Sequence, residues 1–217
     1  ALVEEAEPDE GEALIVAAGR VLGYVQQVTG AVSASYLEER QSIYGEEREA
    51  LRALATALIA GEPTDALAAP VGVTVAPAYV VLHVQIGAHD DESDPGVGGR
   101  VAARRKLRRV QGRLEHWAQQ PVLGLLEPDG GPVLLATTPE DADKITGGLE
   151  ELVHELTEAA GAPVSFGAAL APNVAELQTA AGQARDVLEI AQSLGRSPGA
   201  YLLGDVLLEY QLSRPSV

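Results

Sequence analysis

The chain has 217 residues and a formal net charge of −17, with 32 Asp and Glu against 15 Lys and Arg. Such an acidic chain is by itself a poor binder of nucleic acid, because affinity for the phosphate backbone rests on clustered cations. The sequence has no cysteine, which excludes disulfides, thiolate metal sites and a cysteine nucleophile. No window approaches about 20 consecutive apolar residues, so we expect no membrane span and a cytoplasmic protein.

Residues 1–62 have the pattern of a helical sensor or dimerisation module. An acidic lead-in is followed by a long predicted helix that reaches about Tyr44, and a second helix is predicted from Glu46 to Ala60. The apolar positions of the first helix step by four and three residues, the spacing of a packed seam between helices. The seam residues are Leu14, Val21, Val25, Val28 and Val32. They fit a homodimer seam and fit equally well packing on the chain's own second helix.

Residues 63–77 hold Pro63, Pro70, Pro77 and Gly72, with Gly61 shortly before them, and this composition predicts a linker. The pattern then changes from all-helical to alternating strands and helices. In chain order we expect a strand over 78–86, a polar loop, a helix over 100–119, strands over 121–126 and 133–138, a helix to 161, a strand over 162–170, a helix over 173–195, a strand over 201–206 and a last helical turn.

This order is β-α-β-β-α-β with one further αβ unit. A ferredoxin-like core has the same order, and nucleotidyl-cyclase palms extend it in this way. The predicted fold class is therefore α+β: an N-terminal helical module followed, over 78–217, by a ferredoxin-like or cyclase-palm-like domain with a mixed, mostly antiparallel sheet.

The hairpin at the centre of this domain is marked by Asp129, Gly130 and Gly131 between two apolar runs. Glycine adopts positive φ without steric cost, so the sequence predicts a tight turn from Pro128 to Pro132. The flanking runs do not alternate apolar with polar residues, which indicates strands covered on both faces.

The same hairpin carries the catalytic signature in a nucleotidyl cyclase, where acidic residues follow the two glycines. Here Pro132 and Val133 stand in those places, and the strand over 78–86 contains no carboxylate. An active cyclase needs such carboxylates to hold divalent metals against phosphates. We therefore expect a degenerate signature, no catalytic residue, no metal and no cofactor. The polar stretch His89-Asp90-Asp91 is read as a loop, since it lacks an ordered ligand spacing.

Seven of the fifteen basic residues lie on the helix predicted over 100–119. Arginine forks suit carboxylates and phosphates, so this face is a candidate site for an anionic effector. The candidate residues are Arg104, Arg105, Arg108 and Arg109. The alternative is a solvated helix face that binds nothing.

Three segments resemble the PucR/CdaR type of bacterial transcriptional regulator. They are REALRALATALIAGEP (48–63), PAYVVLHVQI (77–86) and LEIAQSLGRSPGAYLLGDVLLEYQLSR (188–214). The resemblance implies a helical N-terminal sensor region, a degenerate GGDEF-like domain and a C-terminal helix-turn-helix. Because this sequence stops at Val217, we expect DNA to be bound only through a C-terminal domain that it lacks.

The preferred hypothesis is the regulatory part of such a transcription factor, a homodimer that responds to a small-molecule effector and has no enzymatic activity. One alternative is a nucleotide-binding or cyclase-like enzyme. Another is a ligand-free protein-interaction module in stress signalling.

Overall fold

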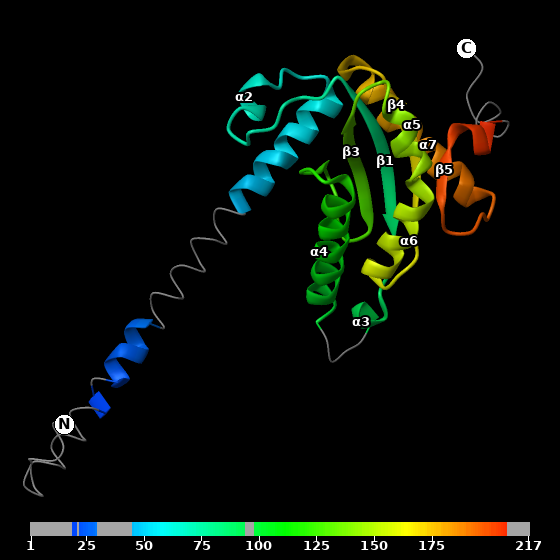
Figure 1. Ribbon diagram of the computed structural model, residues 1–217. Helices are drawn as coiled ribbons and strands as arrows, with labels where there is room; N and C mark the ends of the chain where they lie inside the picture. The colour runs from blue at the N-terminus through cyan, green and yellow to red at the C-terminus, as the bar shows by residue number, and fades with distance from the viewer. Residues whose placement is uncertain (1–18, 21, 30–44, 94–97, 208–217) are drawn as a thin grey trace, which may run out of the picture. The chain divides into compact units, whose positions relative to one another are not determined.

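The computed structural model describes residues 19–20, 22–29, 45–93 and 98–207 (Figure 1). It divides into two compact units, residues 1–48 and 49–217. In the first unit residues 22–29 are helical, and the side chains of Val25 and Val28 are exposed (52% and 41%). Leu14, Val21 and Val32 lie outside the described residues, so the dimer seam stays a prediction. Within the described ranges, no helix is long and apolar enough to cross a membrane.

The second unit begins with helical residues 49–60, before the stretch that the sequence suggests as a linker. Residues 63–77 lie inside this unit and contain the short helix α2 (Asp65–Ala68). Val71, Val73 and Val75 pack against the buried cluster that includes Leu54 and Leu58. The prolines of this stretch interrupt helices, and the apolar residues between them are packed against the rest of the unit.

The sheet has five strands in the order β2-β3-β1-β4-β5. The strands are β1 (Ala78–Ile86), β2 (Leu123–Gly124), β3 (Gly130–Thr137), β4 (Val164–Ala171) and β5 (Ala200–Leu202). Strand β1 is antiparallel to both β3 and β4, β2 is antiparallel to β3, and β4 is parallel to β5. This confirms the predicted α+β class and the mixed, mostly antiparallel sheet, with the β-α-β-β-α-β core order.

The helices that follow the first strand are α3 (Asp90–Ser93), α4 (Gly99–Ala118), α5 (Ala142–Gly147), α6 (Leu149–Ala160) and α7 (Leu177–Ser193), with 3₁₀ turns η1 (Val174–Glu176) and η2 (Leu203–Val206). The single helix predicted up to residue 161 is therefore two, which meet at Gly148. A Cβ on Gly148 would lie 3.1 Å from the Trp117 ring, so the ring of α4 packs closely at this junction. The strand predicted over 201–206 is shorter because η2 replaces its second half.

Strand β1 is covered on both faces, as its continuous apolar run predicts. One face carries Val80, Leu82 and Val84 and packs with the apolar sides of α4 and α6. The other face carries Tyr79 and Val81 and packs with helix 49–60 and α7. Figure 1 shows β1 and β3 side by side in the middle of these helices.

The hairpin turn is tighter than the sequence suggests. Glu127 and Gly130 exchange two backbone hydrogen bonds (2.8 and 3.1 Å), so Pro128 and Asp129 alone form the turn. Gly130, Gly131 and Pro132 already belong to β3. Both glycines have positive φ (134° and 141°), and a Cβ on Gly130 would lie 2.0 Å from the Val84 carbonyl oxygen. The glycines are thus needed for close strand approach, not for the turn itself.

Pro132 also explains why β2 is only two residues long where a six-residue run suggests a full strand. The Leu125 N–H donates to the Pro132 carbonyl oxygen (2.8 Å), but proline has no N–H to return the bond. The ladder therefore stops at the Gly124–Val133 pair and resumes only at the Glu127–Gly130 bridge. Arg52 supports this stretch, because its guanidinium donates to the Leu126 carbonyl (3.3 Å) and the Glu127 carboxylate (2.7 Å).

Candidate functional site

The candidate site begins where one face of β1 changes from apolar to polar. Residues at alternate positions of a strand point to the same face. On the face that α7 covers, the buried Tyr79 and Val81 are followed by the half-buried His83 and the exposed Gln85. The polar end of this face is therefore left open between β1, β3 and α7.

A groove of about 360 Å³ lies at this place, and we call it the hairpin groove. Its walls come from β1, from the hairpin and from the last turns of α7. The lining residues are His83, Val84, Gln85, Asp129, Gly130, Gly131, Leu188, Glu189 and Gln192. The structure thus brings three of the five predicted hairpin residues, Asp129, Gly130 and Gly131, to the wall of a groove.

The other two hairpin residues, Pro132 and Val133, stand where a cyclase would need carboxylates. Pro132 is the cross-strand partner of His83, and Val133 is the partner of Leu82. Val133 is completely buried in the core beneath α4 and α6. The hairpin therefore presents a pyrrolidine ring beside the imidazole of β1 and puts an isopropyl group into the core, and neither can bind a cation.

Two glutamine side chains, one from β1 and one from α7, meet across the groove. The Gln192 Nε2 of α7 donates a hydrogen bond to the Gln85 Oε1 of β1, across 107 positions in the chain. Next to them, the Glu189 carboxylate lies 3.7 Å from the Arg185 guanidinium one helical turn earlier. The groove is thus rich in amide groups that both donate and accept hydrogen bonds.

The imidazole of His83 is held in its neutral form. Burial lowers the pKa of His83, and the positive charge of Arg185 lowers it further, while the Glu189 carboxylate opposes this effect. A neutral imidazole has one donor and one acceptor nitrogen. At neutral pH the groove therefore contains an uncharged histidine next to two amides.

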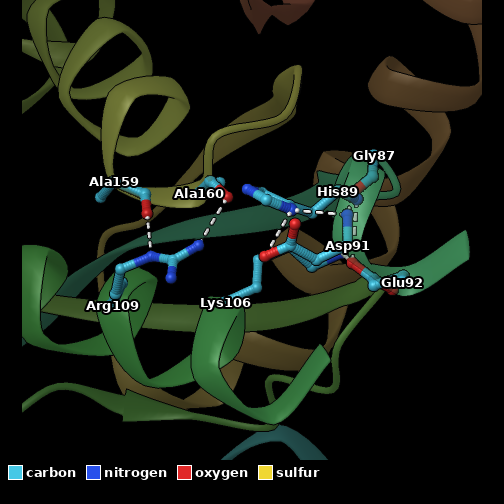
Figure 2. Close-up of polar contacts among 8 residues, drawn as sticks. All are labelled: Gly87, His89, Asp91, Glu92, Lys106, Arg109, Ala159 and Ala160. Atoms are coloured by element: carbon cyan, nitrogen blue, oxygen red, sulfur yellow. Dashed lines mark hydrogen bonds and ion pairs between the residues drawn. The ribbon is translucent and has the colours of Figure 1, made fainter. Parts of the chain in front are cut away.

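A second polar cluster lies at the end of β1, where the chain enters α3 (Figure 2). The Lys106 Nζ donates to the Gly87 carbonyl oxygen (2.7 Å) and lies 2.7 Å from the Glu92 carboxylate. The Lys106 side chain is only 2% exposed. The Glu92 carboxylate also accepts from the His89 N–H (2.9 Å). Lysine and glutamate thus tie the loop after β1 onto α4.

This cluster is absent from the sequence-based candidates, although one signal could have shown it. Ala102, Lys106, Val110 and Leu114 follow one another in steps of four, and all four are buried. A lysine inside an apolar stripe is rarely buried without a partner, and the acidic residues of the preceding loop supply that partner.

Of the four arginines predicted as an anion site, Arg109 has its guanidinium engaged with a neighbouring helix. The Arg109 Nε donates to the Ala159 carbonyl (2.7 Å) and its Nη2 to the Ala160 carbonyl (3.1 Å), at the C-terminus of α6. Arg109 therefore caps a neighbouring helix, as Figure 2 also shows. Arg104, Arg105 and Arg108 are exposed on α4, so their role in binding an effector stays a prediction.

Among the described residues near the end of β1, the histidine and aspartate side chains form no metal-binding group. The Asp91 N–H donates to His89 Nδ1 (3.1 Å), and Glu92 is paired with Lys106. Across residues 19–20, 22–29, 45–93 and 98–207, no group of three or more His, Asp or Glu side chains is arranged to hold a metal ion.

The sequence matches no protein-family model and no curated protein. Solved structures with partial similarity to this chain include two GGDEF-domain proteins. An EAL/GGDEF domain protein from M. capsulatus is 16% identical with a TM-score of 0.39, covering 58% of this chain and 84% of that one. The GGDEF domain of YfiN (TpbB) from Pseudomonas aeruginosa is 17% identical with a TM-score of 0.38, covering 75% and 94%.

Proposed function

We propose that this chain is the regulatory, non-catalytic part of a bacterial transcription factor of the PucR/CdaR type. The observation that carries the proposal is the cross-strand pair of His83 and Pro132 at the hairpin, with Val133 buried next to it. Phosphoryl or nucleotidyl transfer relies on carboxylates that place metal ions against the phosphates. At the two positions that follow the glycines this chain offers a pyrrolidine and an aliphatic side chain instead, and the residue of β1 that faces Pro132 is a histidine.

The resemblance of residues 48–63, 77–86 and 188–214 to such regulators supports the same function. The hairpin groove gives an effector a place to bind, and α7 forms one of its walls. A dimer formed through the N-terminal helix would transmit a change in packing to a C-terminal DNA-binding domain, since operator spacing mirrors the symmetry of the protein. To switch such a dimer fully, the effector must favour one state by roughly 5 kcal/mol.

Two measurements test this function on the 217-residue chain. Incubation with GTP or ATP and Mg²⁺ is expected to give no cyclic or linear dinucleotide product and no release of pyrophosphate. Light scattering is expected to give the mass of a dimer, and the chain alone is not expected to shift DNA in a gel. Formation of a nucleotide product would overturn the non-catalytic part, and a monomer at tens of micromolar would overturn the dimeric part.

A further inference from the structure

We propose that the hairpin groove binds an uncharged, planar heterocycle that carries hydrogen-bond donors and acceptors on its rim, as a free nucleobase does. This inference deepens the proposed function, because it places the effector in the hairpin groove and names its chemical class. It is carried by the two glutamines that face each other, by the charges on the lining and by the size of the groove.

The amides of Gln85 and Gln192 come from a strand and from a helix and meet across the groove. A primary amide has two donor hydrogens and an acceptor oxygen, so the contact between them leaves further donors and acceptors free. Glutamine recognises a nucleobase through such a paired donor and acceptor, as it does with the N6 and N7 positions of adenine. A ligand that separates or bridges the two amides replaces their mutual hydrogen bond with bonds to its own rim.

The charges on the lining disfavour phosphates, although Arg185 partly compensates the charge of Glu189. Asp129 and Glu189 contribute carboxylates, and among the described residues that line the groove none is Lys or Arg. Like charges brought together without compensation weaken binding. The neutral His83 adds a donor or an acceptor without adding positive charge. The groove is thus suited to an uncharged base and unsuited to a nucleoside triphosphate, which a cyclase would have to bind.

The size of the groove fits a small ring. A volume of about 360 Å³ is at the small end of ligand sites. Leu188 of α7 contributes an apolar side chain to the lining. A flat ring can lie against this side chain while its rim reaches the two amides.

The test titrates adenine and uracil, with ATP as the charged comparison, into the intact 217-residue chain. Saturation-transfer NMR and calorimetry measure binding. We expect at least one of the two bases to bind at sub-millimolar to millimolar concentration, and ATP to bind at least tenfold more weakly. Gln85→Ala and Gln192→Ala should each weaken the base at least fivefold. Gln178→Ala is the matched control, because Gln178 is exposed on the same helix outside the groove, and it should leave binding unchanged.

Three results would overturn the inference: neither base binds up to its solubility limit, ATP binds as tightly as the base, or Gln178→Ala weakens binding as much as the two groove variants. Circular dichroism of each variant separates lost binding from lost folding, and two variants on different elements guard against one of them unfolding. The two proposals fail in different ways. If the chain turns over GTP, the proposed function is wrong, whether or not a base binds. If the chain does not turn over GTP and neither base binds, only the present inference is wrong.

Discussion

The ammonium group of Lys106 on α4 lies 2.7 Å from the Glu92 carboxylate, and the two residues hold the loop after β1 against the helix. The lysine is almost fully buried, and the glutamate side chain is 20% exposed. The lysine also donates to the Gly87 carbonyl, so one side chain satisfies both a carboxylate and a backbone oxygen. Removing a buried charge from such a pair leaves its partners without compensation.

Substitution of this lysine should destabilise the fold. Lys106→Met keeps most of the side-chain volume and removes the charge, and we expect a loss of about 2 kcal/mol, below the roughly 3–5 kcal/mol of a fully buried pair because Glu92 is partly exposed. Urea denaturation followed by circular dichroism measures the change. Arg104→Met on the exposed face of α4 is the control and should stay within about 0.5 kcal/mol. Equal effects of the two variants would contradict a special role for the ion pair.

The same pair predicts a loss of stability in acid. Burial raises the pKa of Glu92, but the hydrogen bonds from Lys106 and from the His89 N–H and the nearby positive charges together lower it below its usual value. A carboxyl with a lowered folded-state pKa stabilises the fold above its unfolded pKa, and this contribution is lost as the pH falls through the folded pKa. Urea midpoints from pH 7 down to pH 3 should fall more steeply for the native chain than for Lys106→Met. Parallel curves would show that Glu92 makes no such contribution.

His83 is expected to titrate below the usual histidine range. Its pKa is lowered by burial first and by Arg185 second, so the folded chain binds this proton less readily than the unfolded chain does. Stability linked to His83 is therefore complete above the unfolded pKa of about 6.5 and decreases as the pH falls below it.

NMR titration of the histidine ring protons measures this directly. Arg185→Gln should raise the pKa of His83 because it removes a repelling charge, and Glu189→Gln should lower it because it removes an attracting one. Two results would contradict the described surroundings of His83: a pKa equal to that of a model peptide, or a pKa that neither substitution changes.

Gly130 should tolerate no side chain. A Cβ would lie 2.0 Å from the Val84 carbonyl oxygen, and φ is +134°, so Gly130→Ala must push β1 and β3 apart. We expect a loss of at least about 3 kcal/mol, since backbone strain and disrupted strand pairing act together. Gly112→Ala is the control: nothing lies within 4 Å of its Cβ on α4, and alanine should stabilise the helix by roughly 0.5–1 kcal/mol. Thermal unfolding should move in opposite directions for the two variants.

The N-terminal stripe predicts how the chain associates. Val25 and Val28 are exposed in the described part of their helix, which leaves their side chains available to a second copy. Val25→Glu with Val28→Glu should convert a dimer to a monomer in light scattering, because carboxylates cannot be buried in a packed seam without partners. Arg20→Glu, at a helical residue outside the stripe, should keep the dimer. An unchanged mass in the double variant would rule out a dimer seam at these valines.

The spacing of apolar residues predicts the helices and strands whose burial depends on their own sequence. The apolar stripe of α4 includes Val110 and Leu114, which are completely buried, while Trp117 is partly buried. The continuous run of β1 predicted a strand covered on both faces. The burial of Lys106 was missed, because it depends on Glu92 in a separate loop. The length of β2 was overestimated, because one missing N–H in the partner strand limits its ladder.

The hairpin groove cannot be predicted from the sequence, because it also depends on contacts between segments that are distant in the chain. His83 and Gln85 can be assigned to a strand from local pattern, and Gln192 to a helix. Their meeting depends on how closely α7 approaches the sheet, which is set at Gly167 of β4. A Cβ there would lie 2.0 Å from the Ala184 carbonyl oxygen, so this glycine lets the helix backbone contact the strand. Such an approach between distant segments leaves no periodic trace in the sequence.

The proline in β3 has one more effect, on how separate molecules meet in solution. The outermost strands β2 and β5 contribute only two and three residues to the ladder. A long row of unpaired backbone groups at the rim of a sheet is a template on which other chains aggregate. Pro132 stops β2 early and η2 stops β5, so each outermost strand of the described sheet offers only a short ladder to a strand added from another molecule.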